Sequence, residues 1–233
     1  MELVIQNTSG IVQIDGEYRN YQLINKGVAT PDTVIVSPPG EYMAQYKSLQ
    51  FTGLNNPIMV IRCADYAYVN QNVSGGTHTF TLYRDKAKSS TISWWLFDDV
   101  KPAAAAGGLT MRNAANEVVF SSDAPPFRVA GLVEHDSDGS GSSDYLFTAG
   151  RTYAYTPCRL AESVSVNVGP GGTGSNPTVA IYDAVSGCKA MTGGVSMGAV
   201  VWFVFAGNYN DAPQADPWVS SRSVWLIVDV TDL

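Results

Sequence analysis

The chain has 233 residues, of which 45% are hydrophobic, 11% aromatic and only 15% charged, and its net charge is −7. This composition excludes an intrinsically disordered chain, which combines low hydrophobicity with high charge. It also disfavours a helical bundle or coiled coil, which would be rich in Ala, Glu, Lys and Leu. Nucleic-acid binding needs a positive patch that neutralises phosphates, and the sequence has no basic run of that kind.

Neither a membrane span nor a disulfide framework is visible. The longest apolar run, residues 199–206, is far shorter than the roughly 18 residues that cross a bilayer, so we expect no membrane insertion. The first residues lack the basic and apolar segments of a signal peptide. Cys63, Cys158 and Cys188 are an odd, sparse set. We therefore expect a chain made and assembled in a reducing cytoplasm.

Hydrophobicity alternates with a period of two almost throughout, which is typical of half-buried antiparallel strands. Leu3 and Ile5 begin this pattern, and Phe80 and Leu82 share one face of a later strand. His78, in the same strand pattern, is expected at the surface. Unbroken apolar stretches predict buried strands at residues 58–62, 92–97, 178–182, 199–206 and 224–230. The best helix candidate, residues 102–106, is too short. The sequence predicts an all-β chain of two antiparallel β-sandwich-like units with long Gly-rich loops and little or no helix.

A weak internal repeat suggests where the two units meet. When Glu2 is aligned with Gly108, an offset of 106 residues, identities fall at three pairs, and apolar residues match up to Leu23 and Val129. The identical pairs are Leu3/Leu109, Asn7/Asn113 and Val12/Val118. Gly10 and Asn116 coincide at a turn position, and both residue types tolerate the left-handed backbone region. We predict a β-sandwich unit over residues 1–106 that opens with a hairpin, and a second unit over 107–233 that contains the acidic loop 136–144.

Two glycine motifs fit catalytic or cofactor sites poorly. Gly-Val-Ser-Met-Gly at 194–198 matches a nucleophile elbow, but that site needs a following helix and a later histidine, and both are missing. We interpret it as a turn before a buried strand. Gly-Pro-Gly-Gly-Thr-Gly at 169–174 matches a dinucleotide motif, but a strand pattern follows where a phosphate-binding helix is required. We interpret it as a hairpin tip, and we expect no catalytic residue and no cofactor.

The acidic loop at 136–144 resembles the first half of a calcium loop. Asp136 and Asp138 stand at alternate positions, as oxygen ligands of one cation do, but the expected glutamate is Phe147. We interpret it as a solvated acidic loop and predict no metal site, and a calcium site is the alternative. The loop, with Asp144, is instead a candidate contact for a receptor or partner.

Aromatic and paired acidic residues leave two further binding alternatives. Trp94, Trp95, Trp202 and Trp225 lie in apolar strand-like runs and are expected in the core. Trp218 follows a polar, proline-rich segment and is the best candidate for an exposed aromatic contact with a sugar or a partner. The pairs Asp98-Asp99 and Asp229 with Asp232 would serve a glycosidase only if two carboxyl groups faced each other across a cleft.

Four segments share a pattern with one protein family. They are the opening hairpin 2–15, Trp-Trp-Leu-Phe-Asp at 94–98, Gly-Leu-Thr-Met-Arg-Asn-Ala at 108–114, and the final strand 225–231. Together they resemble the small tail-tip or baseplate (minor tail) proteins of long non-contractile-tailed bacteriophages. In that family a strand ending in Phe-Asp precedes such a hairpin. The resemblance covers residues 1–130 and the last strand, and its motifs are structural.

The resemblance implies a structural virion protein near the host-attachment end of the tail, with other tail proteins as partners. It implies a homo-oligomeric ring with threefold or sixfold symmetry, assembled in the host cytoplasm and located at the tail tip. The alternative is a module that binds a host surface glycan or a pilus through Trp218 and the loops 136–144 and 169–177. A β-rich depolymerase that uses Asp98 or Asp229 is a third hypothesis.

Overall fold

The structure, a computed structural model, describes residues 4–6, 12–15, 20–37, 40–99, 104–136, 142–169, 178–208 and 222–233. All the regular secondary structure in these residues is β-strand, so the prediction of an all-β chain is confirmed. The strands are β1 Val4–Gln6, β2 Val12–Asp15, β3 Gln22–Ala29, β4 Thr33–Ser37, β5 Gly40–Thr52, β6 Ile58–Arg62, β7 Ala67–Ser74, β8 Thr77–Asp85, β9 Ile92–Asp98, β10 Thr110–Arg112, β11 Val118–Ser121, β12 Val129–Asp136, β13 Ser143–Leu146, β14 Tyr153–Arg159, β15 Glu162–Gly169, β16 Thr178–Met191, β17 Gly194–Asn208 and β18 Arg222–Asp229.

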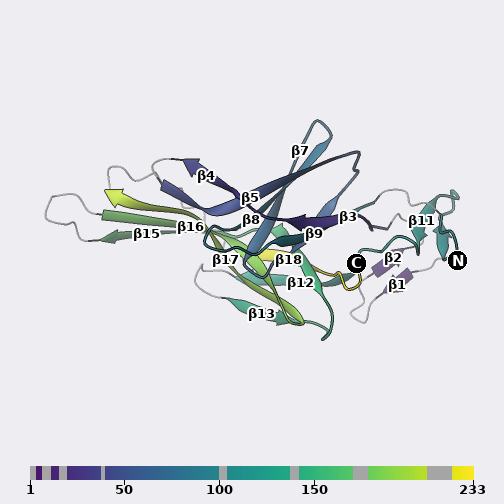
Figure 1. The fold of residues 1–233 in the computed structure, drawn as a ribbon. Helices are drawn as coiled ribbons and strands as arrows, with labels where there is room; N and C mark the ends of the chain where they lie inside the picture. Colours follow the sequence, from purple (N-terminus) through teal and green to yellow (C-terminus); the bar gives the residue numbers. More distant parts are fainter. Residues whose placement is uncertain are drawn as a thin grey trace.

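Two large antiparallel sheets form the body of the molecule. The six-stranded sheet has the order β12-β18-β14-β6-β9-β3, and the eight-stranded sheet has the order β13-β17-β16-β7-β8-β5-β4, with β15 paired to β16. Figure 1 shows that these strands make an elongated molecule, with β4, β15 and β16 at one end and the small hairpins β1-β2 and β10-β11 at the other. The described residues contain no helix with the length and apolar character of a membrane span.

The main hydrophobic core lies between the two large sheets. Trp94, Tyr155 and Trp225 from the six-stranded sheet join Phe80 and Met197 from the eight-stranded sheet in one buried cluster. Trp95 belongs to a second cluster on the opposite face of the six-stranded sheet, where Phe127 also packs. Neighbouring residues of β9 therefore face different cores, which explains why its sequence is apolar without alternation. The expected burial of Trp94, Trp95 and Trp225 is confirmed.

The alternation predicted around Phe80 and Leu82 is confirmed, but the surface position predicted for His78 is wrong. Along β8 buried and half-buried side chains alternate without interruption. His78, Phe80 and Leu82 follow one another at intervals of two residues, so all three lie on the buried face. His78 is 7% exposed, and its Nδ1 accepts a hydrogen bond from Nε2 of Gln71 at 3.1 Å. This partner offsets the cost of burying the ring.

The internal repeat predicted at an offset of 106 is present in the described residues. In β1-β2, Val4 pairs with Asp15 and Gln6 with Val12, and a register shift follows Ile5. In β10-β11, Thr110 pairs with Ser121 and Arg112 with Val118, with the shift after Met111. All of these positions correspond at the same offset, so the two hairpins have one register. Asn116 has a φ of 61°, as the turn requires.

The repeat extends into both large sheets. Gly27 pairs with Trp94 in β3-β9, and Val133 pairs with Trp225 in β12-β18, with register shifts at matching places. In the six-stranded sheet, β6 and its neighbour β9 correspond to β14 and its neighbour β18. In the eight-stranded sheet, β8 lies between β5 and β7, and β17 correspondingly lies between β13 and β16. Of the strands that the structure describes, nine lie on each side of the 106/107 boundary. Strands from both sides nevertheless combine in the same two sheets, because β6 pairs with β14 and β7 with β16.

The glycine motif at 194–198 lies within strand β17 and not before it, which corrects the predicted turn. The turn ends at Gly193, whose φ is 71°. Gly194 lies against β13, and a Cβ atom at this position would stand 2.1 Å from the backbone oxygen of Tyr145. A glycine is therefore required for the two strands to approach this closely.

We expect Gly194→Ala to lower the free energy of unfolding by about 1–3 kcal/mol, because the added carbon forces backbone and not a flexible side chain to move. Chemical denaturation followed by tryptophan fluorescence measures this change. Gly107→Ala is the matched control, since its Cβ would meet nothing within 4 Å, and it should stay within about 0.5 kcal/mol of wild type. Equal stability of the two variants would contradict the close strand approach.

Candidate interaction site between β6 and β14

The two central strands of the six-stranded sheet part from each other soon after they meet. β6 pairs with β9 over all five of its residues, but it pairs with β14 only where Ile61 faces Tyr155. Pro157 follows two residues later in β14. Proline has no N–H and cannot donate to a strand ladder, so the sequence itself limits pairing beyond this point.

A cavity of about 440 Å³ opens where the strands part. Its floor includes Val69 and Phe80 from the other sheet, so it reaches the core between the sheets. A second depression shares Pro57, Ile58 and Gln71 with it. The cavity is lined by Pro57, Ile58, Met59, Val69, Asn70, Gln71, Phe80, Thr156, Pro157, Cys158, Arg159, Leu160 and Leu226, and the second depression also by Tyr21, Asn55, Asn56, Val73 and His78.

The repeat explains why the cavity opens beside Met59 of β6 and not at the equivalent position in β14. Met59 pairs with Leu96 in β6-β9, and Tyr155 pairs with Ile227 in β14-β18, so Met59 and Tyr155 occupy equivalent positions. The Tyr155 ring is fully buried and lies edge-on to Trp225 at a centroid distance of 5.9 Å. Burial raises the pKa of its hydroxyl well above the ordinary value. The smaller, unbranched Met59 leaves open the space that an aromatic ring fills in the other half.

The lining of the cavity is apolar with a few polar groups at its rim. Arg159 is its one charged residue, and its Nε donates to the backbone oxygen of Arg222 at 2.8 Å. Tyr21 lines the second depression, and its pKa is raised by burial and by the carboxylates of Asp99 and Asp98. The Tyr21 hydroxyl is therefore neutral at physiological pH. An apolar cavity with a positive group at its edge suits an occupant that carries an apolar side chain next to an acidic one.

The candidate residues of the acidic loop are not brought into this cavity. Asp136 ends β12, where its Oδ1 accepts a hydrogen bond from Nε of Arg222 at 3.1 Å. Asp144 is exposed on β13, which belongs to the other large sheet. Trp218 and Asp138 lie outside the described residues. Among the residues that the structure describes, no group of three or more His, Cys, Asp or Glu side chains could hold a metal ion.

The two aspartates considered for glycosidase chemistry occupy equivalent strand ends. Asp98 is fully buried and accepts backbone N–H groups of Asn55 at 2.9 Å and Asn56 at 2.8 Å. β9 and β18 run in opposite directions within one antiparallel sheet, so Asp98 and Asp229 lie at opposite ends of it. They cannot face each other across one cleft as a glycosidase pair must.

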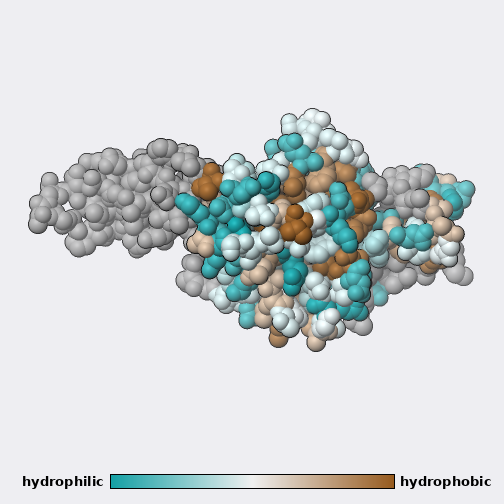
Figure 2. Space-filling model, viewed as in Figure 1, coloured by the Kyte–Doolittle hydropathy of each residue, from teal (hydrophilic) through white to brown (hydrophobic). Residues whose placement is uncertain are grey.

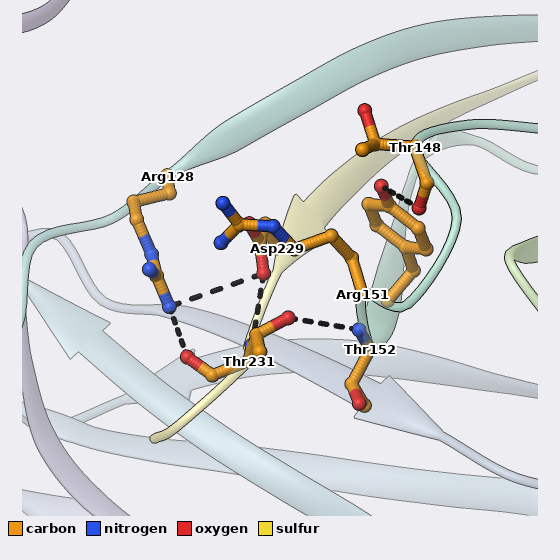
Figure 3. Close-up of polar contacts among 7 residues, drawn as sticks. Arg128, Thr148, Arg151, Thr152, Asp229 and Thr231 are labelled. Atoms are coloured by element: carbon orange, nitrogen blue, oxygen red, sulfur yellow. Dashed lines mark hydrogen bonds and ion pairs between the residues drawn. The ribbon is translucent and has the colours of Figure 1, made fainter.

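Figure 3 shows how Asp229 is held. Its Oδ2 lies 3.2 Å from Nη1 of Arg151, and its Oδ1 lies 3.9 Å from Nη2 of Arg128. The backbone N–H of Thr231 also donates to it, at 2.9 Å. The carboxylate thus connects the end of β18 to two loops, which is a structural role.

Ser196, the serine of the nucleophile-like motif, lies near the start of β17 and is 2% exposed. Its Oγ lies 3.3 Å from the hydroxyl of Tyr66, whose ring covers Gly198. A buried serine in a regular strand does not have the exposed turn geometry of a nucleophile elbow.

Comparisons of the chain with protein-family models, with curated proteins and with solved structures gave no match. The site therefore has to be interpreted from its own geometry. The sequence analysis did not identify its lining residues, because they come from strands that are distant in the chain. Pro157, within an apolar strand, was the one signal that pairing would fail there.

The cavity rim carries a usable chemical reporter. Cys158 is exposed, whereas Cys63 and Cys188 are buried. Partial burial raises the pKa of the Cys158 thiol, so less reactive thiolate is present at pH 8 than in a free cysteine.

We expect iodoacetamide to modify one thiol per folded chain, more slowly at pH 8 than it modifies free cysteine, and faster as the pH rises through the raised pKa. Intact-mass spectrometry at several time points and pH values measures this. Cys158→Ser should show no modification while folded, and denatured wild-type protein should show three. Modification of Cys63 or Cys188 in the folded protein would contradict the described burial.

Proposed function

We propose that this chain is a structural protein of a bacteriophage tail tip or baseplate, which assembles with other tail proteins and helps to form the host-attachment end. The observation that carries the proposal is the exposure of large apolar side chains on outer strands of both large sheets. Val28 on β3 is 65% exposed, Leu132 on β12 is 59% exposed, and Leu146 on β13 is 71% exposed. In the assembly that we propose, neighbouring subunits cover these side chains.

The composition supports the same proposal. Only 15% of the residues are charged, and partner-covered surface is depleted in charge relative to free surface. Figure 2 shows apolar side chains among polar ones in the middle of the visible face. A homo-oligomeric ring, threefold or sixfold, and a virion location with assembly in the host cytoplasm are parts of this proposal, together with the absence of enzymatic activity.

A receptor-binding module for a host glycan or pilus is the second candidate function. The polar groups at the rim of the cavity favour it, because Asn70, Gln71 and Thr156 offer the hydrogen-bonding groups that a sugar uses. On this alternative the isolated chain binds host cells or their surface polysaccharide without other tail proteins.

Negative-stain microscopy of virions labelled with a gold-conjugated antibody against this chain tests the first proposal. We expect gold at the tail tip, in numbers consistent with a ring. An antibody against the major capsid protein is the control and should label heads only. Label on heads, along the tail shaft or nowhere would contradict the proposal, and binding of the isolated chain to host cells would favour the second candidate.

A further inference from the structure

One strand next to the cavity has an uncovered backbone edge. β7 and β8 are joined by a two-residue turn at Gly75 and Gly76, which have φ values of 57° and 76°. Both values are positive, as in a type I′ hairpin, in which the residues that flank the turn form a hydrogen-bonded pair. Along antiparallel strands, residue pairs that exchange backbone hydrogen bonds alternate with pairs that do not. The backbone N–H and C=O groups of Gln71 and Val73 therefore point away from β8.

No other described strand takes up these groups. β16 is the strand beside β7, but it pairs with β7 only where Cys188 faces Ala67. Val73 is 53% exposed, and the side chain of Gln71 lines both the cavity and the second depression. The uncovered edge of β7 thus runs along the open space between β6 and β14.

The other half of the repeat shows what closes an edge of this kind. Counted from their turns, Val73 is equivalent to Ala190, and Gln71 to Cys188. The N–H of Ala190 donates to the backbone oxygen of Cys63 at 2.7 Å, and Cys188 pairs with Ala67. Extended backbone of this chain therefore covers the equivalent edge. In that half Tyr155 fills the equivalent of the cavity.

We propose that the edge of β7 at Gln71 and Val73, with the cavity beside it, binds an extended segment of a partner protein as an added strand. One apolar side chain of that segment enters the cavity toward Met59 and Phe80, and an acidic side chain two residues further on, which lies on the same face of the segment, meets Arg159. Main-chain hydrogen bonds supply affinity and the pocket supplies specificity in this mode of recognition. The inference does not depend on the tail-tip proposal, since it follows from an open strand edge and cavity.

Fluorescence anisotropy with defined peptides tests the site. The probe is a fluorescein-labelled, acetylated octapeptide of sequence Thr-Val-Thr-Leu-Thr-Asp-Thr-Thr, in which Leu and Asp share one face, and its comparison peptide has Lys in place of Asp. We expect wild type to bind the acidic peptide at least tenfold more tightly than the Lys peptide. Arg159→Glu should reverse that preference, because the charge at the rim is inverted.

Two substitutions at Gln71 separate the backbone from the side chain. Gln71→Pro removes the outward N–H without removing a hydrogen bond to β8, and it should weaken binding at least tenfold. Gln71→Ala keeps the N–H and should bind within about twofold of wild type. Met59→Tyr, which copies the residue of the closed half, should also weaken binding at least tenfold, because the ring takes the space of the apolar anchor.

Hydrogen exchange supplies a readout that does not depend on any variant. The amides of Gln71 and Val73 should exchange quickly in the free chain and slowly with the acidic peptide, while Asn70 and Asn72 stay protected throughout. Equal binding of Gln71→Pro and Gln71→Ala would overturn the proposal, as would an unchanged preference in Arg159→Glu. If Gln71→Pro fails to fold by near-UV circular dichroism, the Arg159 and Met59 variants and the exchange data decide. Cavity binding of dodecanoate without any peptide binding would also overturn it.

Discussion

The fold depends on the junction between its two halves, where β6 meets β14 and β7 meets β16. Each of these two junctions has a single residue pair in register, Ile61 with Tyr155 and Ala67 with Cys188, and β5 and β17 add two more pairs between the halves. So few ladder contacts contribute little by themselves. The halves are held instead by the buried cluster between the sheets, to which both contribute aromatic side chains. Because burial of apolar area is the larger stabilising contribution, neither half would keep its core if the other were removed.

At this junction, equivalent positions of the two halves carry different side chains. Tyr155 closes the core in one half, whereas Met59 at the matching position leaves a cavity. The aspartates differ in the same way, since Asp98 is held by backbone N–H groups and Asp229 by arginines. A duplicated framework that is already stable tolerates such divergence. The half with the cavity is therefore where a binding surface can arise at little cost to the fold.

The sequence predicted the positions of strands better than it predicted which strands pair with each other. Period-two alternation and unbroken apolar runs predicted several of the strands, and the offset of 106 predicted equivalent hairpins, because both depend on neighbouring residues. The same offset fails further along the chain, where Trp94 corresponds to Trp225, 131 positions on. The surface position predicted for His78 is wrong because His78 stands two residues before Phe80 and so lies on the same, buried face of β8.

Strand order could not be predicted, because the side-chain pattern of an antiparallel strand is the same whichever strand lies beside it. The mixing of both halves in each sheet is therefore invisible in the sequence, and so is the cavity that the mixing creates. Of the candidate contacts, Asp136 is engaged by Arg222 at a strand end, and Trp218 lies outside the described residues. The residues of the cavity carried no motif, since apolar lining residues look like any other core residues.

Two of the outer strands have backbone groups that side chains cover. On β3, the N–H of Lys26 is taken by the side-chain oxygen of the neighbouring Asn25 at 2.8 Å. On β12, the backbone oxygen of Glu134 accepts the hydroxyl of Tyr145 at 2.9 Å. Such coverage protects a sheet edge from unwanted strand addition. In the assembly that we propose, neighbouring subunits would contact these outer strands through exposed side chains such as Val28 and Leu132. Within the part of the chain that the structure describes, the edge at Gln71 and Val73 has no such cover, so an added strand can form hydrogen bonds with its main chain.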